Sequence, residues 1–512
     1  MSYVFRPLTL DQILADPCRE RGWKNGGLIM LNTILAVVQI SSYATGYDGS
    51  MMNGLQSLDT WQTYFKNPTP ETLGLLNAIQ NIGQLAALPF CAIACDKSGR
   101  VAVLLFGAFI ILIGTALQDG MFIAARGIIG LGLAFNITAA PLLLLELAYP
   151  TQRAPMVSIY NALWNSGAIV AAWVTYGTFR ITNDWAWRIP SIVQAVASLI
   201  QIFSCFFLVE SPRWLVSRGK HEKAKDVITK YHANGNADDP LVALELEEIC
   251  RALDFELEIS NSSYMAFFES RGNLHRFFII LAVGFFSQWS GNGLISYYLA
   301  VVLDSIGITG QNTQTLINGI LQIWGLVTSL FFASLVNKFG RRTLFLVSTI
   351  SVLVVFIIWT ALEATYEKQT ANGGTADPAV AKGVLVMIFL YTLAFNIGWN
   401  PLQVTYVIEI LPYHLRAKGL VLYNLFVACA LIFNQYANPI ALAKITWKYY
   451  IVYDVWIAVE LAVVYFLFLE TGNMSLEQTA AILDGAPIEK NLTTEVTRAS
   501  DYEAAIIMYD RE

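Results

Sequence analysis

The sequence has 512 residues, of which 55% are hydrophobic and only 14% are charged, and its mean hydropathy is +0.52. Because a soluble domain is typically about 25% charged, this composition excludes an ordinary soluble protein and indicates a polytopic membrane protein. The net charge of −6 comes without a basic stripe, which argues against nucleic acid as a partner.

The N-terminal residues 1–25 are polar and mixed in charge. They contain neither a short apolar core nor a small-residue cleavage site, so we expect no removable signal peptide. Twelve apolar segments follow, each near the roughly 20 residues that a membrane-spanning helix needs. They lie near 27–50, 72–95, 101–118, 121–145, 155–179, 187–209, 275–302, 315–336, 342–362, 383–408, 417–441 and 448–469.

A long polar interruption separates the sixth segment from the seventh. It contains SRGKHEKAKDVITK and LELEEICRALDFELE, which are typical of short amphipathic helices on a membrane surface. We therefore predict an all-α membrane protein with two six-helix halves. Its predicted parts are an N-terminal cytoplasmic segment (1–25), the first half (26–209), a cytoplasmic linker (210–274), the second half (275–470) and a cytoplasmic tail (471–512).

Basic residues in the short loops give the orientation, because cytoplasmic loops carry an excess of Lys and Arg. If the spans alternate, one side collects Lys97, Arg100, Arg153, Arg213, Arg218, Lys338, Arg341, Arg342, Arg416 and Lys418. The other side keeps Lys66, Arg180, Arg188, Lys368, Lys444 and Lys448. We expect the first side, with both termini, to face the cytoplasm.

Three motifs of the first half recur in the same order in the second half. DKSGR (96–100) corresponds to NKFGRR (337–342), ELAYPTQRA (146–154) to EILPYHLRA (409–417), and FFLVESPRWL (206–215) to FLFLETGNMSLE (466–477). Parallel repeats of this kind, with a binding site between them at mid-membrane, are a transporter architecture.

These motifs, together with Gly46-Tyr47-Asp48, Arg126-Gly127 and the highly specific string ESPRWL (210–215), resemble those of the sugar porter family of the major facilitator superfamily. The resemblance covers roughly residues 25–480. It implies a monomeric multi-pass transporter, in the plasma membrane by default, whose partners are a sugar, a proton and the lipid bilayer.

Asp48 lies inside the first apolar segment, where a carboxylate costs roughly 2.5–3.5 kcal/mol on insertion scales. The resemblance implies that Asp48 and Arg126 form a proton site. The alternative is a permanent structural ion pair, as in uniporters of the family. All four histidines fall in predicted loops, so a carboxylate must carry any coupled proton. Asp454 and Glu460 in the last span are rivals, for which we favour a packing or lipid-interface role.

The other charged motifs lie at predicted cytoplasmic helix ends, where Arg can bridge carboxylates and helix ends in one conformation and release them in another. The resemblance implies a reversible latch between the halves, and the alternative is static retention of basic residues. The candidate gate residues are Asp96, Arg100, Glu146, Arg153, Glu210, Arg213, Arg341, Glu409 and Arg416. Asn337 replaces the acid usual in the second-half motif, which predicts a weaker latch there.

Polar clusters in two spans indicate a sugar pocket. Span seven contains FFSQWSGNGLISYY (285–298) and span ten contains FNIGWNPLQVTYVIE (395–409), where Pro401 breaks the hydrogen-bond ladder. Polar residues beside such a break usually line a cavity. The candidate substrate-binding residues are Asn161, Gln288, Asn292, Tyr297, Tyr298, Trp399, Asn400 and Gln403.

Compared with the hexose-type pattern, the sequence has shorter side chains at several of these positions, including Ser287, Gly293, Asn161 and Val404. They imply a wider cavity, and the strings SQWSGNG and WNPLQV resemble fungal lactose and cellodextrin permeases. We therefore predict a proton-coupled disaccharide symporter working by alternating access, with a hexose or pentose transporter or a facilitator as the alternative.

A non-transporting sugar sensor is the rival from another class, and the tail of about 40 residues after Glu470 disfavours it. We find no nucleophile–base arrangement, metal cluster or phosphate-binding loop in the sequence. We therefore expect no enzymatic activity, no cofactor and no metal.

Overall fold

The computed structural model describes residues 25–259, 264–336, 338–371, 377–472 and 483, and within these ranges every regular element is a helix. The first half consists of α2 (Gly26–Leu55), α4 (Pro70–Ser98), α5 (Arg100–Leu117), α6 (Phe122–Leu147), α7 (Arg153–Thr178) and α8 (Trp185–Phe203). The second half consists of α13 (Arg271–Trp289), α14 (Asn292–Ser305), α15 (Gln311–Leu335), α16 (Arg341–Ala371), α17 (Pro378–Ile410), α18 (Tyr413–Ile445) and α19 (Lys448–Leu467).

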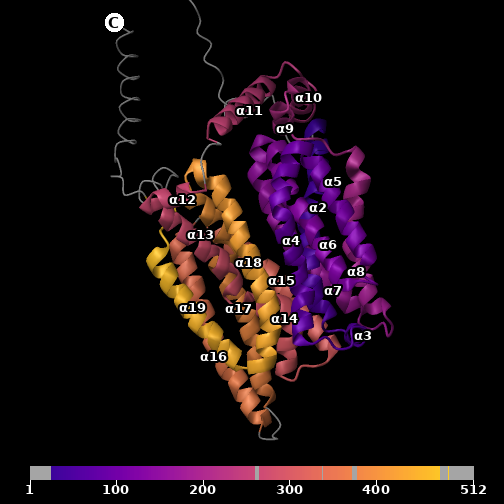
Figure 1. Ribbon diagram of the computed structural model, residues 1–512, viewed down its shortest axis with the longest axis vertical. Coiled ribbons are helices and arrows are strands. Elements are labelled where there is room, and N and C mark those ends of the chain that lie inside the picture. The colour runs from indigo at the N-terminus through magenta and orange to yellow at the C-terminus, as the bar shows by residue number, and fades with distance from the viewer. Residues whose placement is uncertain (1–24, 260–263, 337, 372–376, 473–482, 484–512) are drawn as a thin grey trace, which may run out of the picture.

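Short helices complete the described chain. They are α3 (Asp59–Tyr64), η2 (Pro150–Gln152), η3 (Ser204–Phe206), α9 (Pro212–Ser217), α10 (His221–His232), α11 (Pro240–Ile259) and α12 (Ala266–Glu269). Figure 1 shows two helical bundles side by side, with α9, α10 and α11 above one end of the first bundle and α12 at the same end of the second. We call this end the linker face and the other end the opposite face.

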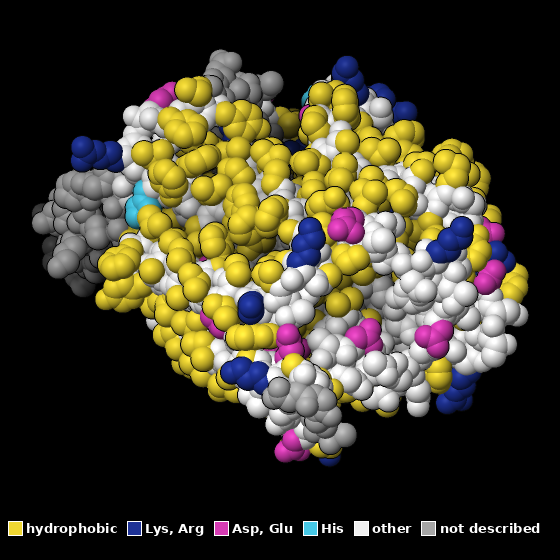
Figure 2. Space-filling model, turned by 60° about the horizontal axis from the view of Figure 1, so that its bottom comes forward, with side chains coloured by type: hydrophobic (Ala, Val, Ile, Leu, Met, Phe, Trp, Pro, Cys, Tyr) yellow, Lys and Arg dark blue, Asp and Glu magenta, His cyan; other side chains and the backbone are white. Residues whose placement is uncertain are grey.

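The prediction of twelve spans is confirmed. Eleven helical segments are long and apolar enough to cross a membrane, with α13 and α14 joined as one segment. The twelfth span is α7, which is more polar because it carries residues such as Asn161 and Asn165, and which packs between α2 and α15. Figure 2 shows the molecule obliquely, with the opposite face turned toward the viewer, and hydrophobic side chains cover much of the surface in this view, as expected of a protein surrounded by lipid.

Several spans begin at residues that satisfy the free N–H groups of the first helical turn. The Asn25 side chain accepts from the N–H of Leu28 at 3.0 Å, and the Ser270 side chain accepts from the N–H of Asn273 at 3.1 Å. Thr69 and Asp377 each precede a proline at the first helical position and also accept from a backbone N–H. The span boundaries therefore follow from local sequence.

The seventh span is discontinuous, which differs from the sequence prediction. Gly291 separates α13 from α14 with φ of +96°, a left-handed backbone that glycine adopts at little cost. A second irregularity lies inside α14 at Tyr298 (φ −134°, ψ 26°). Pro401 removes one backbone donor from the hydrogen-bond ladder of α17, as expected, but α17 runs through that residue as one helix.

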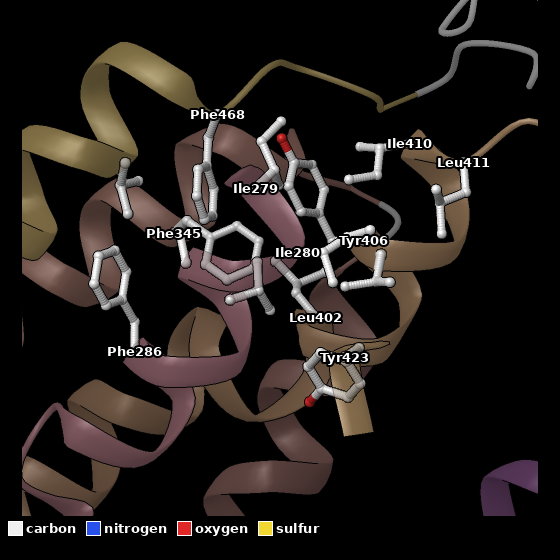
Figure 3. Packing of buried hydrophobic residues seen from close by; sticks show 14 of the residues in the cluster. Ile279, Ile280, Phe286, Phe345, Leu402, Tyr406, Ile410, Leu411, Tyr423 and Phe468 are labelled. Atoms are coloured by element: carbon white, nitrogen blue, oxygen red, sulfur yellow. The ribbon is translucent and has the colours of Figure 1, made fainter. Parts of the chain in front are cut away.

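Aromatic rings fill the linker-face end of the second half, where α13, α16, α17, α18 and α19 converge (Figure 3). The Phe345 ring lies 5.0 Å from the Trp399 ring, 5.3 Å from Tyr406 and 5.1 Å from Phe468, measured between centroids. These rings fix the helix ends that carry the second-half charged motifs.

Helices α2 and α7 approach each other through glycine. A Cβ atom added at Gly46 would overlap the backbone carbonyl of Trp164, and one added at Gly167 would overlap the carbonyl of Tyr43. Small residues allow this backbone-to-backbone packing inside a membrane. The two helices therefore form one tightly packed unit of the first half.

We predict that Gly167→Leu separates α2 from α7 and destabilises the protein by about 1–3 kcal/mol or more, as overpacking does. The melting temperature of the detergent-purified protein should fall by several degrees. Gly177→Leu is the matched control on the same helix, because nothing lies within 4 Å of a Cβ at Gly177. Equal effects of the two variants would contradict the packing argument.

Candidate functional site

A polar cavity of about 380 Å³ lies between the two halves. The first half contributes Gly49 and Ser50 from α2 and Trp164 and Asn165 from α7. The second half contributes Ser287, Gln288, Asn292, Ile295, Ser296, Tyr297, Leu321, Gln322, Gly325, Tyr391, Thr392, Phe395, Asn396, Asn400, Gln403 and Leu431. None of these described lining residues carries a charge. A larger hollow of about 700 Å³ beside α4 and α6 is almost entirely apolar and offers no such chemistry.

Two buried polar atoms of the cavity wall lack a hydrogen-bond partner. They are Ser50 Oγ and Asn292 Oδ1, and they come from opposite halves. The amide nitrogen of Asn292 donates to the carbonyl of Ser287 at 3.0 Å, which holds the residue in place. Because both unpaired atoms are themselves buried, they are polar groups left unsatisfied in this conformation rather than contacts open to a ligand.

Five of the eight predicted substrate-binding residues line this cavity: Gln288, Asn292, Tyr297, Asn400 and Gln403. Their side chains are partly fixed by neighbours. The amide of Asn400 donates to Ser329 Oγ at 3.1 Å, and the amide oxygen of Gln403 accepts from the Tyr423 hydroxyl at 2.9 Å. The wall is therefore ordered before any ligand binds.

The structure does not bring Asn161, Tyr298 or Trp399 to the cavity wall. Asn161 is exposed one turn nearer the linker face. Tyr298 is fully buried, and its hydroxyl donates to the carbonyl of Gln435. Trp399 belongs to the aromatic core, with its indole N–H donating to Thr349 Oγ1 at 3.1 Å.

Sequence reasoning missed most of the wall, including the polar and aromatic residues Trp164, Asn165 and Asn396. Asn165 lies one helical turn after Asn161, on the same face of α7, and this spacing could have identified it. Asn396 donates to the carbonyl of Gly325 at 3.1 Å and to Thr328 Oγ1 at 2.7 Å, which ties α17 to α15.

Asp48 and Arg126 form a buried ion pair with exposed fractions of 1% and 2%. Arg126 Nη1 lies 3.6 Å from Asp48 Oδ1 and makes no hydrogen bond, so the pair is close without being bidentate. Gln80 connects the two charges, since its amide nitrogen donates to Asp48 and its amide oxygen accepts from Arg126. The amide of Gln194 also donates to Asp48.

This arrangement suits a carboxylate that exchanges a cation partner for a proton. Arg126 keeps other contacts, because its Nε donates to the carbonyl of Leu76 at 3.1 Å and its Nη2 donates to Gln80. Asp48 directly precedes the cavity-wall residues Gly49 and Ser50. The ion pair and the cavity wall are therefore adjacent along α2.

Hydrogen bonds join the halves between the cavity and the opposite face. Asn53 of α2, which is 1% exposed, donates to the carbonyl of Ile295 and accepts from the N–H of Leu299, both at 3.0 Å. It thereby satisfies backbone groups on either side of the irregular residue Tyr298. The amide of Gln56 donates to the carbonyl of Tyr297 at 3.0 Å, which closes this end of the cavity.

Arg–Glu networks at the linker face repeat in the two halves. Arg100 binds both carboxylate oxygens of Glu146 at 3.0 and 3.1 Å, and Arg341 binds Glu409 Oε1 at 3.2 Å. Glu210 accepts from the N–H groups of Arg100 and Val101.

The matching acid of the second half, Glu470, accepts from the N–H groups of Arg341 and Arg342. Each network connects residues at the end of a single half, whereas the sequence prediction was a latch that joins the two halves.

The remaining gate candidates lie beside these networks. Asp96 is 3.7 Å from Arg100, and Arg153 Nε donates to the carbonyl of Ala148 at 3.4 Å. Arg213 lies in the first turn of α9 and Arg416 in the first turn of α18. Asn337 lies outside the described residues.

The rival acids of the last span do not line the cavity. Glu460 is completely buried, and its Oε2 lies 2.8 Å from Ser290 Oγ at the end of α13. The lipid-interface alternative is therefore wrong for Glu460, which packs against the break in the seventh span. Asp454 is partly exposed.

Comparison with known proteins gives matches over most of the chain. The family described as "Sugar (and other) transporter" matches residues 34–483. The MFS-type transporter criB of Aspergillus cristatus is 26% identical over 93% of this chain and 98% of its own. The high-affinity glucose transporter of Kluyveromyces lactis is 27% identical, over 86% of this chain and 82% of its own.

A probable quinate permease of Neosartorya fischeri is 26% identical over 92% of this chain and 90% of its own. Among solved structures, the inward-open xylose transporter XylE from E. coli has a TM-score of 0.72 at 20% identity, covering 88% of this chain and 99% of its own. A structure of a D-xylose–proton symporter has a TM-score of 0.67 at 19% identity, covering 87% and 99%. These structures share the fold of this chain.

We predict that Asn53→Ala loosens the contact between the halves, because a buried backbone donor or acceptor without a partner costs about 1–3 kcal/mol. In a background without the six native cysteines, a cysteine at the cavity-wall position 392 should react about tenfold faster with an impermeant maleimide applied from the opposite face. Asn312→Ala, at the exposed start of α15, is the control. An unchanged rate in Asn53→Ala would show that this contact does not close the cavity.

Proposed function

The chain belongs to the sugar (and other) transporter family, and we propose that it is a proton-coupled symporter that imports a neutral disaccharide. It is a sugar transporter of the major facilitator superfamily and not an enzyme. The observation that carries the proposal is the cavity between the halves, whose described wall is uncharged and combines amide and hydroxyl side chains with aromatic rings.

A neutral substrate suits this cavity better than an anionic one. Quinate carries a carboxylate, and one of the relatives is a probable quinate permease. A buried anion needs a cation or several charge-assisted hydrogen bonds, whereas the described wall contains no Lys, Arg or His. Amide and hydroxyl groups, together with the Trp164 and Phe395 rings, match the hydroxyl and C–H surfaces of a sugar.

One side chain shorter than in the hexose-type pattern supports a disaccharide, because Ser287 lies in the wall. The other shorter residues do not widen the described cavity: Gly293, Asn161 and Val404 are not in its wall, and the space beside Gly293 is filled by Asn434. The volume of about 380 Å³ lies within the range of small-molecule sites. A single hexose or pentose is the second candidate, because relatives include glucose transporters.

Proton coupling is proposed for the Asp48–Arg126 pair. Protonation of Asp48 removes its attraction to Arg126, which the amide of Gln80 and the carbonyl of Leu76 continue to hold. One charge moved through 100 mV is worth about 2.3 kcal/mol, and about 1.4 kcal/mol corresponds to a tenfold ratio. One proton per sugar therefore supports accumulation of several tens-fold.

The hydrogen bonds near the opposite face support an inward-open arrangement in which the linker face is cytoplasmic. We propose that the networks around Arg100 and Arg341 hold each half rigid and meet the other half when the linker face closes.

We also propose that the protein is located in the plasma membrane, that both termini are cytoplasmic, and that it functions as a monomer. A non-transporting sensor is the outcome that a negative transport experiment would favour.

The test is uptake of labelled lactose, cellobiose or glucose by yeast that expresses the chain, with the external pH of a dilute suspension recorded in parallel. We expect uptake and alkalinisation with one disaccharide, and no competition by quinate. Uptake of glucose alone would establish the single-sugar alternative. Uptake without alkalinisation would establish a facilitator, and failure with all three sugars would contradict transport of these substrates.

We predict that Asp48→Asn abolishes accumulation while exchange of sugar down its gradient persists, because the amide cannot bind and release a proton. The measurement is the ratio of internal to external labelled sugar at steady state, followed by counterflow of preloaded vesicles. Asp59→Asn, an exposed acid at the start of α3, is the control. Asp48→Asn cells that still concentrate sugar would refute the assignment.

A further inference from the structure

A buried histidine connects the linker to the first half of the transporter. His232 is the last residue of α10, and its ring lies between Glu245 of α11 and the final carbonyl of α6, that of Leu147. Nδ1 is 2.8 Å from Glu245 Oε2, and Nε2 is 3.1 Å from the Leu147 oxygen. Both side chains are 3% exposed.

For both contacts to be hydrogen bonds, the His232–Glu245 pair must hold one proton more than a neutral imidazole and a carboxylate carry together. A carbonyl oxygen only accepts, so Nε2 must carry a hydrogen to bond to Leu147. A carboxylate also only accepts, so Nδ1 must carry a second hydrogen, whereas neutral imidazole has one. The pair is satisfied either as imidazolium with carboxylate or as neutral imidazole with a protonated Glu245.

The surroundings favour a bound proton at this position. The Leu147 carbonyl belongs to the negative end of the α6 dipole, where a cationic histidine is stabilised. Within the described part of the chain, the ring of Tyr149 also contacts the His232 ring, edge-on with centroids 5.5 Å apart. Lys230, two residues before His232 on α10, lies over the ring of Tyr231.

Other contacts near the His232–Glu245 pair also attach the linker to the first half. The Asn234 side chain accepts from the N–H of Gly27 at 3.1 Å, and a Cβ at Gly27 would press against the carbonyl of Lys230. On α9, the Trp214 indole donates to the carbonyl of Asp96 at 2.8 Å. All these partners belong to the first half, so the linker is attached to the ends of α2, α4 and α6.

We propose that His232 and Glu245 form a proton-binding site that clamps α10 and α11 to the end of α6 and loosens them when the proton leaves. As the pH rises, neutral imidazole can keep only one of its two hydrogen bonds, so docking is strongest at low pH. The site is separate from Asp48, and its chemistry does not depend on which substrate is transported or on whether transport is proton-coupled.

The experiment is hydrogen–deuterium exchange of the purified full chain at about pH 5.5 and about pH 8, which bracket the range in which histidines usually change charge. Exchange times are scaled for the intrinsic pH dependence of amide exchange. We expect protection of α10 and α11 to fall about tenfold at the higher pH, because the linker then loses a hydrogen bond to a charged group. Peptides from α2 and α13 report on the integrity of the fold.

Glu245→Gln is the decisive variant. Its amide can donate to Nδ1 of neutral His232, whose Nε2–H then donates to Leu147, so both hydrogen bonds form without the extra proton. We expect high protection at both pH values in Glu245→Gln, low protection at both in His232→Gln, and wild-type behaviour in His221→Gln, which changes an exposed histidine of the same helix.

Two results would overturn the proposal: equal protection of the wild-type linker at both pH values, or a Glu245→Gln variant that keeps the wild-type pH dependence. If Glu245→Gln fails to fold, the proposal is tested by comparing the pH dependence of linker protection in the wild type with that in His232→Gln. A pH dependence that survives in His232→Gln would then exclude this pair as the proton site.

Discussion

The structure depends on the requirement that every backbone polar group inside a bilayer has a hydrogen-bond partner. A span can therefore bend only where a side chain supplies the missing bonds. In α14 the bend at Tyr298 is satisfied by Asn53, which belongs to the other half. The place where the seventh span is irregular is thus also the place where the halves meet, and separating them exposes the unpaired groups of Ile295 and Leu299.

The two halves repeat the same Arg–Glu networks but contribute unequally to the cavity wall. Glu210 and Glu470 accept from the first N–H groups of α5 and α16, and each start is also bound by an Arg–Glu pair of the same half. These repeated contacts fix helix ends. The cavity wall is instead contributed mostly by α13, α14, α15 and α17 of the second half, while the buried ion pair belongs to the first half.

The spans could be predicted from sequence because apolar length is a local property, whereas the Asp48–Arg126 pair was implied by the family resemblance. The depth of a residue along its helix is not a local property, and Asn165 lines the wall where Asn161 was predicted. Pro401 removes a backbone donor without interrupting α17, whereas the seventh span is interrupted at Gly291, where the Phe356 ring leaves no room for a side chain. Gln80 and Gln194 were missed as partners of Asp48, because single amides give no sequence signal.

The close packing of α2 against α7 has a consequence for how the residues along α2 move. Asp48, the wall residue Ser50 and the closing residue Asn53 lie within six positions of one helix, a distance of about 7.5 Å along its axis at 1.5 Å per residue. Backbone contacts at Gly46 and Gly167 pack α2 tightly against α7. The ion pair, a wall residue and the residue that joins the two halves therefore lie on one short, tightly packed segment of α2, so a displacement of this segment moves all three together.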